Sequence, residues 1–70
     1  MSKVLVYTET LITSLEPERT LRLADECLVD IRAVEERNVS NAWIYEYEIK
    51  GEAGKMAKFF SRIKDIETGE

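Results

Sequence analysis

The segment formed by residues 41–50 places the tightest constraint on the fold, because its side chains alternate in character along the chain. Aromatic and aliphatic residues occupy every second position, and the positions between them include two glutamates. A period of two residues is typical of a β-strand with one buried face and one solvated face. We therefore predict a strand whose apolar face consists of Trp43, Tyr45, Tyr47 and Ile49.

A second strand is predicted over residues 3–13, which are rich in β-branched and aromatic side chains. Its first apolar residues follow one another with no polar residue between them. Both faces of this strand are therefore expected to be buried where it begins.

A helix is predicted between the two strands, from Pro17 to about Arg37. Proline fixes φ at a helical value and needs no N–H partner in the first turn, so the helix is expected to begin at Pro17. Apolar residues recur at helical spacing on one side, and charged residues occupy the other. Val29 and Ala33 are the only apolar residues on the charged side, and Asn38 is expected to end the helix in the left-handed conformation.

A further helix is predicted from the residues after Gly51 to about Glu67, again with one apolar side. The order strand, helix, strand, helix predicts an α+β fold in which a right-handed crossover joins two parallel strands. We expect a compact β-α-β-α two-layer sandwich, with both helices covering one face of a small sheet. Because a two-stranded sheet leaves open edges, we expect dimerisation to complete it as a continuous four-stranded sheet.

The composition favours a single small domain spanning residues 1–70. A folded chain of this length buries only about 60% of the surface that its unfolded form exposes, so its core is marginal. One cysteine and no histidine leave neither a disulfide nor a typical metal site to stabilise it, which favours oligomerisation. The net charge of −4 disfavours nucleic acid and anionic membranes as partners. Since the sequence begins with no leader and contains no long apolar run, the expected compartment is the cytoplasm.

No catalytic, cofactor-binding or metal-binding residue is predicted. Catalysis at neutral pH most often uses histidine, which the sequence lacks. Cys27 lies on the apolar side of the first predicted helix and is interpreted as a buried structural thiol. Glu46 and Glu48 would stand about 7 Å apart on one strand face, a spacing open to a hard cation or an acid/base pair, but a solvated face is the favoured interpretation. Residues 50–55 lack the spacing of a phosphate-binding loop and are interpreted as a helix N-terminus.

The second predicted helix carries a basic stripe formed by Lys55, Lys58 and Arg62, beside Phe59. Such a stripe could face an acidic partner or a phosphate backbone, or it could be a solvated face that complements the helix dipole. The solvated face is the favoured interpretation, and these four residues are kept as candidates for an interaction.

The aromatic residues of the central predicted strand are the other candidates for an interaction. Trp43, Tyr45 and Tyr47 could form an open platform on which bases stack. Because the two helices need the same apolar face to cover their own apolar sides, packing of these rings in the core is the favoured interpretation.

Together these patterns favour a non-catalytic protein-binding or regulatory module, such as a small regulator, an inhibitor or an accessory subunit, acting as a homodimer. Two alternatives stay open. One is a nucleic-acid-binding protein that uses the basic stripe of the second helix. The other is a small-ligand-sensing dimer with a pocket between sheet and helices.

Overall fold

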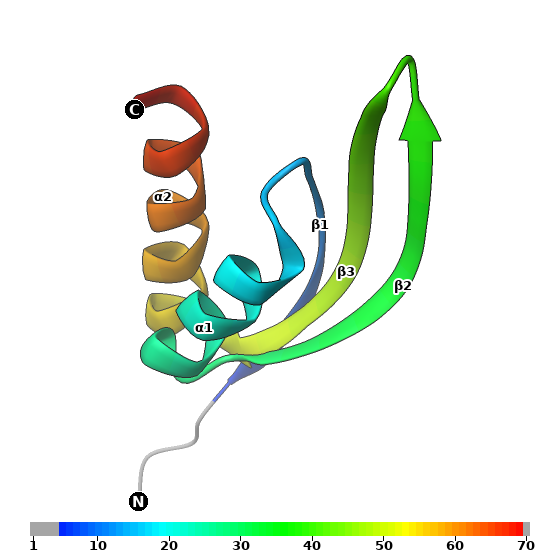
Figure 1. Cartoon of the computed structure of the whole chain (residues 1–70). Helices are drawn as coiled ribbons and strands as arrows, with labels where there is room; N and C mark the ends of the chain where they lie inside the picture. Colours follow the sequence, from blue (N-terminus) through cyan, green and yellow to red (C-terminus); the bar gives the residue numbers. More distant parts are fainter. Residues whose placement is uncertain (1–4, 70) are drawn as a thin grey trace, which may run out of the picture.

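Three strands form one antiparallel sheet in the order β1-β3-β2, and two helices accompany it (Figure 1). The computed structural model describes residues 5–69. Over this range the elements are β1 (Val6–Thr13), α1 (Pro17–Cys27), β2 (Asp30–Val39), β3 (Ala42–Glu52) and α2 (Ala53–Gly69). The predicted α+β class is confirmed, whereas the prediction of a two-stranded sheet is wrong.

The first helix is much shorter than the sequence pattern predicts, since α1 ends at Cys27 and not near Arg37. Leu28 adopts the left-handed conformation, with φ 61° and ψ 43°. The N–H groups of Leu28 and Val29 donate to the carbonyls of Asp25 and Ala24, at 3.3 Å and 3.0 Å. This pair of hydrogen bonds is the Schellman motif, which satisfies the last carbonyls of a helix and turns the chain away from its axis.

The residues predicted as the second half of that helix form β2. Ile31 and Ala33 lie opposite Ile49 and Tyr47 of β3, so they share the apolar face of the sheet. A β-bulge interrupts the pairing between Ala33 and Glu35. Val29 and Ala33, the two apolar residues on the charged side of the predicted helix, are thereby explained. Val29 is buried just before β2, and Ala33 lies on the face of β2 that is turned toward the helices.

A two-residue turn joins β2 to β3 and reverses the chain. Ser40 and Asn41 both have positive φ, 53° and 70°, as in the type I′ turns that match the twist of paired strands. Asn38, the predicted helix terminator, instead pairs with Trp43 near this turn. Because the hairpin reverses the chain, β1 and β3 are antiparallel neighbours, so the prediction that these two strands are parallel is wrong. The parallel strands that α1 joins are β1 and β2, with β3 between them.

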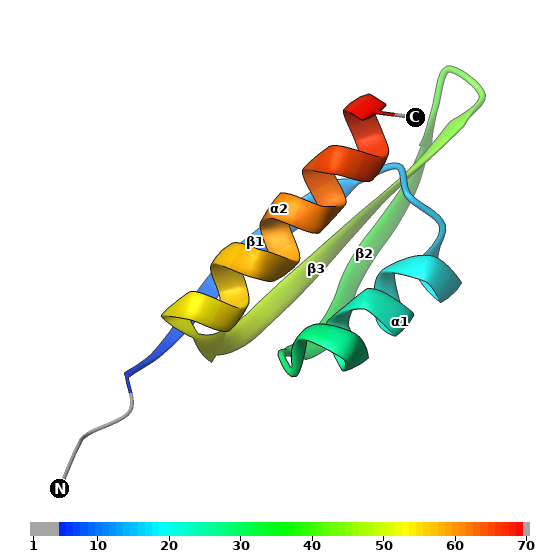
Figure 2. The same ribbon diagram turned by 90° about the vertical axis from the view of Figure 1, so that its left-hand side faces the viewer.

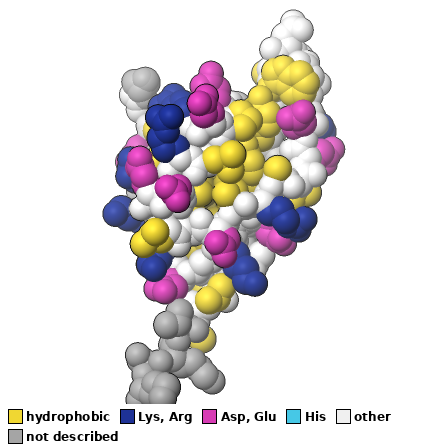
Figure 3. Space-filling view, turned by 60° about the horizontal axis from the view of Figure 1, so that its bottom comes forward, with side chains coloured by type: hydrophobic (Ala, Val, Ile, Leu, Met, Phe, Trp, Pro, Cys, Tyr) yellow, Lys and Arg dark blue, Asp and Glu magenta, His cyan; other side chains and the backbone are white. Residues whose placement is uncertain are grey.

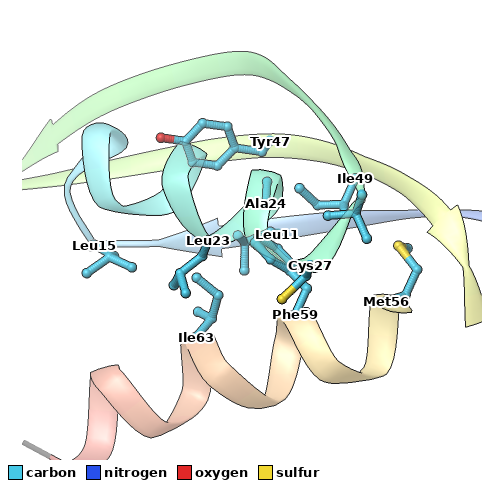
Figure 4. Packing of buried hydrophobic residues seen from close by; sticks show 11 residues of the cluster. Leu11, Leu15, Leu23, Ala24, Cys27, Tyr47, Ile49, Met56, Phe59 and Ile63 are labelled. Carbon is cyan, nitrogen blue, oxygen red and sulfur yellow. The ribbon is translucent and has the colours of Figure 1, made fainter. Parts of the chain in front are cut away.

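Both helices lie on the same side of the sheet in Figures 1 and 2. Between them and the sheet is a core that includes Phe59 and Ile63 of α2 and Ile49 of β3, all fully buried (Figure 4). Cys27 belongs to this core, as predicted from the sequence. α1 begins at Pro17, which is also as predicted.

Gly51 allows β3, the start of β2 and the start of α2 to approach one another closely. A Cβ atom at this position would lie 3.0 Å from Cγ1 of Val29 and 3.6 Å from Sδ of Met56. No side chain fits there without displacing its neighbours. α2 follows β3 directly at Ala53, so the chain passes from sheet to helix with no loop.

β1 is fixed at one end and exposed at the other. The hydroxyl of Thr13 donates to the carboxylate of Glu67 and accepts from the N–H of Leu15 at 3.0 Å, which ties the end of β1 to the end of α2. Val6 and Tyr7, by contrast, are exposed. The expectation that both faces are buried at the start of the strand is therefore wrong for these residues, and the predicted strand residues 3 and 4 lie outside the described range.

Candidate protein-binding surfaces

The hairpin of β2 and β3 extends past α1 as an arm, and the helices leave the end of its apolar face uncovered (Figures 1 and 2). Trp43 is 50% exposed on this arm and stacks on Tyr45, with ring centroids 6.5 Å apart and ring planes 17° from parallel. Tyr47, the next inward-facing residue of β3, is buried. The favoured interpretation, packing in the core, therefore holds for Tyr47, whereas Trp43 and Tyr45 remain accessible.

A groove of about 360 Å³ lies between α1 and this arm. Apolar side chains make up most of its walls, and Figure 3 shows hydrophobic side chains gathered in the middle of the viewed face and again toward the projecting end. Two aliphatic residues that line the groove are about half exposed, Leu21 at 49% and Val34 at 50%. We call this surface the arm groove; its lining residues are Pro17, Leu21, Ala33, Val34, Glu35, Glu36, Tyr45 and Tyr47.

The Tyr47 hydroxyl is a buried polar group at the arm groove. The residue is only 2% exposed, and its hydroxyl oxygen has no hydrogen-bond partner within residues 5–69. The nearby hydroxyl of Thr20 donates to the Glu16 carbonyl at 3.0 Å. Burial raises the pKa of Tyr47, and the proximity of Tyr45 and Glu36 raises it further, whereas the Thr20 side chain opposes the shift. The phenol is therefore neutral at physiological pH and has its O–H available to donate.

The polar rim of the arm groove is acidic. Glu35 and Glu36 line it, and none of its lining residues is basic. Glu35 lies 3.7 Å from Arg37, in an ion pair whose two side chains are both about half exposed. Glu36 forms no ion pair within the described part of the chain. The groove therefore combines apolar walls with net negative charge.

β1 is the outer strand on the other side of the sheet, and its outer edge pairs with no strand within residues 5–69, so this edge is free. β1 pairs with β3 over all eight of its residues in unbroken register. It contains no proline and only one charged residue, Glu9. On the helix side, a second groove of about 340 Å³ runs beside this edge; it is lined by Tyr7, Glu9, Ala53, Met56, Ala57 and Phe60.

The basic stripe of α2 is largely engaged within the chain. Lys55 lies 3.5 Å from Glu52, and Arg62 lies 3.3 Å from Glu26 of α1. The Lys58 side chain is exposed, whereas the Phe59 ring is fully buried against Phe60 and does not reach the surface. The structure therefore does not bring the stripe, Phe59 and the aromatic residues of β3 together on one surface.

Glu46 and Glu48 lie on the face of the sheet opposite the helices. Arg32 donates to one carboxylate oxygen of Glu48 through Nε at 3.2 Å and Nη2 at 2.8 Å. Glu46 lies opposite Glu35 of β2. Residues 5–69 contain no group of three His, Cys, Asp or Glu side chains placed to hold a metal ion.

Of the residues that line the arm groove, the sequence identified only Tyr45 and Tyr47 as candidates. Leu21 and Val34 were missed because both were placed on the buried side of one long helix. The groove exists only because α1 ends early and the chain returns as β2. Within the described range, neither helix combines the length and apolarity needed to cross a membrane. Comparisons with protein-family models, with curated proteins and with solved structures find no match to this chain.

Proposed function

We propose that this chain is a non-catalytic protein-binding module that acts as a homodimer, of the kind expected of a small regulator, an inhibitor or an accessory subunit. The observation that carries the proposal is the free edge of β1. Unpaired N–H and C=O groups along an edge strand are a template for another strand, and proteins that stay monomeric usually block such edges.

The two outer strands differ in how well their edges are blocked. Half of the ten residues of β2 are charged, and a bulge breaks its register between Ala33 and Glu35. Charged side chains and bulges both disfavour strand addition. β1 has neither protection beyond Glu9. Strand addition at β1 is therefore the favoured route.

The groove beside β1 supports the same route. Tyr7 is exposed and Phe60 is half-buried at this groove, next to the free edge. A second copy paired at β1 would bring its own α2 toward this groove and cover these rings. The two-layer sandwich would then continue across six strands, with all helices on one face.

The sequence of β1 also limits the register of such a pair. Two copies related by a two-fold axis perpendicular to the sheet would pair antiparallel, with one residue opposite itself. An axis at Glu9 would oppose two carboxylates, which is unfavourable. An axis at Thr8 or Thr10 would oppose two threonines on the solvated face instead. Among the three axes at residues 8–10, we therefore expect one of these two.

The test is the mass of the protein in solution, measured by light scattering after gel filtration. At about 100 µM, where a dimer with a micromolar Kd is largely formed, we expect twice the 8.1 kDa chain mass. The double variant Thr8→Lys with Thr10→Lys opposes lysines in either register and is expected to be monomeric. The control, Ser61→Lys with Thr68→Lys, adds the same charge to exposed positions of α2 and is expected to remain dimeric.

A monomeric wild-type protein at this concentration would overturn the homodimer. A Thr8→Lys, Thr10→Lys variant that is still dimeric, with an unchanged circular dichroism spectrum, would overturn the assignment of β1 as the interface. The nucleic-acid alternative has less support, because two of the three basic residues of the stripe lie beside acidic partners and Phe59 is buried.

A further inference from the structure

The arm groove has one polar group that the described chain does not satisfy, the hydroxyl of Tyr47. Buried polar groups in folded proteins nearly always have a hydrogen-bond partner, so an exception at a groove needs a reason. No hydrogen bond joins it to Thr20, whose own hydroxyl donates to the Glu16 carbonyl at 3.0 Å. A ligand that reaches the wall of the groove with an acceptor oxygen would satisfy the Tyr47 O–H.

The apolar walls of the arm groove favour a ligand with an apolar group next to the acceptor oxygen. Leu21 of α1 and Val34 of β2 both line the groove, and each exposes about half of its surface. The volume of about 360 Å³ lies near the lower end of the range of roughly 300–1,000 Å³ for ligand pockets. It suits one or two side chains of a protein, and the stacked rings of Tyr45 and Trp43 extend the apolar surface along the arm.

The negative charge of the groove favours a ligand with basic residues next to that apolar group. Glu36 has no ion-pair partner within residues 5–69, and Glu35 shares only an exposed pair with Arg37. The whole chain carries a net charge of −4, so no long-range positive field offsets this rim. Lysine or arginine next to the apolar anchor would complement the rim, whereas a second acidic copy of this chain would not.

We infer that the arm groove binds a short segment of a partner protein in which an apolar anchor side chain has Lys or Arg neighbours and a carbonyl oxygen accepts from the Tyr47 hydroxyl. This inference rests on the proposed function of protein binding and names the surface and the chemistry of the partner. Recognition would combine apolar burial for affinity with charge complementarity for selectivity.

The probe for this inference is a library of random 12-residue peptides displayed on phage and selected against the full chain. We expect selected peptides to share one or two large apolar residues with Lys or Arg within a few positions. The variant Val34→Lys places a positive charge in the apolar wall, which would repel the basic residues of the ligand, and it is expected to lose binding of the selected peptides. Because Val34 is half exposed at the bulge of β2, this substitution should leave the fold intact, which circular dichroism would verify.

Two further variants test the polar contacts with a selected peptide, by fluorescence anisotropy. Tyr47→Phe removes the donor and keeps the ring, and it is expected to weaken binding about threefold to tenfold, the effect of one neutral hydrogen bond. Glu36→Gln is expected to weaken binding and to reduce its dependence on salt. The control Asp65→Asn removes the same charge from α2 and is expected to change neither.

Selected peptides without an excess of Lys or Arg, or peptides that bind wild type and Val34→Lys equally, would overturn the inference. Failure to select any peptide would overturn it as well. The result is separable from the dimer, because the groove lies beside β2 and the proposed interface is β1. A protein that dimerises but selects no peptide would lose only the groove, and one that selects peptides as a monomer would lose only the dimer.

Discussion

Replacing Tyr47 with phenylalanine should make the free protein more stable. The substitution removes one buried hydroxyl that has no hydrogen-bond partner within residues 5–69 and keeps the ring that packs against the core. In most folded proteins the loss of a buried hydroxyl is destabilising, because it breaks a hydrogen bond. Here the hydroxyl is desolvated on folding without such a bond, so its removal reverses the usual sign.

The size of the effect follows from the burial of the residue. A buried polar group without a hydrogen-bond partner costs about 1–3 kcal/mol. We therefore expect Tyr47→Phe to raise the free energy of unfolding by about 1 kcal/mol. For a domain of this size that corresponds to a rise in Tm of about 4–8 °C, or in the urea midpoint of about 1 M, since m is close to 1 kcal/mol/M in small domains.

The assay is urea unfolding followed by circular dichroism, with both proteins at the same concentration because unfolding of a dimer depends on concentration. Tyr45→Phe is the matched control, since Tyr45 is only half-buried, and it should change the free energy of unfolding by less than about 0.5 kcal/mol. A loss of 1 kcal/mol or more in Tyr47→Phe, with Tyr45→Phe unchanged, would refute the reasoning. It would mean that the Tyr47 hydroxyl is satisfied in the free protein, and the polar part of the arm groove would lose its basis.

Further predictions concern the core, the surface and alkaline pH. Gly51→Ala forces a Cβ to within 3.0 Å of Val29 and should lower the free energy of unfolding by about 1–3 kcal/mol in urea titrations. Phe59→Ala empties a fully buried site and should cost about 3–5 kcal/mol, enough to unfold much of a small domain in thermal melts. Arg32→Ala removes only an exposed ion pair and should cost less than about 1 kcal/mol. Folding raises the pKa of Tyr47 and so favours its neutral form. The free energy of unfolding should therefore fall as the pH rises above about 10, the ordinary pKa of tyrosine, and it should fall less in Tyr47→Phe.

Parts of the fold could be predicted because local chemistry decides them. The proline at position 17 starts α1, and the alternation of residues 41–50 describes most of β3. The same holds for α2, whose apolar side chains Met56, Phe59 and Ile63 are buried as their spacing indicates. In each case one pattern fits one structure, and tertiary packing agrees with it.

The end of α1 could not be predicted, because two patterns fit the residues that follow it. Val29, Ile31 and Ala33 suit a strand face at a period of two, while other apolar residues in the same stretch continue the helical period. Helices usually end at glycine in the left-handed conformation, but here Leu28 takes that position and gives no compositional sign of it. The hairpin turn is similarly obscure, since Ser40 and Asn41 replace the asparagine-glycine pair that marks most type I′ turns.

The position at which α1 ends also determines how much of the arm groove could be predicted from the sequence. Trp43 and Tyr45 were identified as candidates from their strand alone, but their exposure depends on how far α1 extends across the sheet. Leu21 and Val34 line the same groove only because the chain turns back at Leu28. The sequence pattern placed both residues in one continuous helix, and a groove cannot form between two parts of the same straight helix.

The third strand changes the reason for expecting a homodimer. A sheet of β1 and β3 alone would be too small to be stable, so a second copy would be needed to complete the fold. With β2 present, β3 is central and the sheet buries a core against two helices without help. What then favours association is the unequal protection of the two outer strands, since charges and a bulge cover the edge of β2 and nothing comparable covers β1. If association completed the fold, Thr8→Lys with Thr10→Lys would unfold the chain. Under our proposal the edge of β1 is only a docking site, so the same variant should remain folded as a monomer.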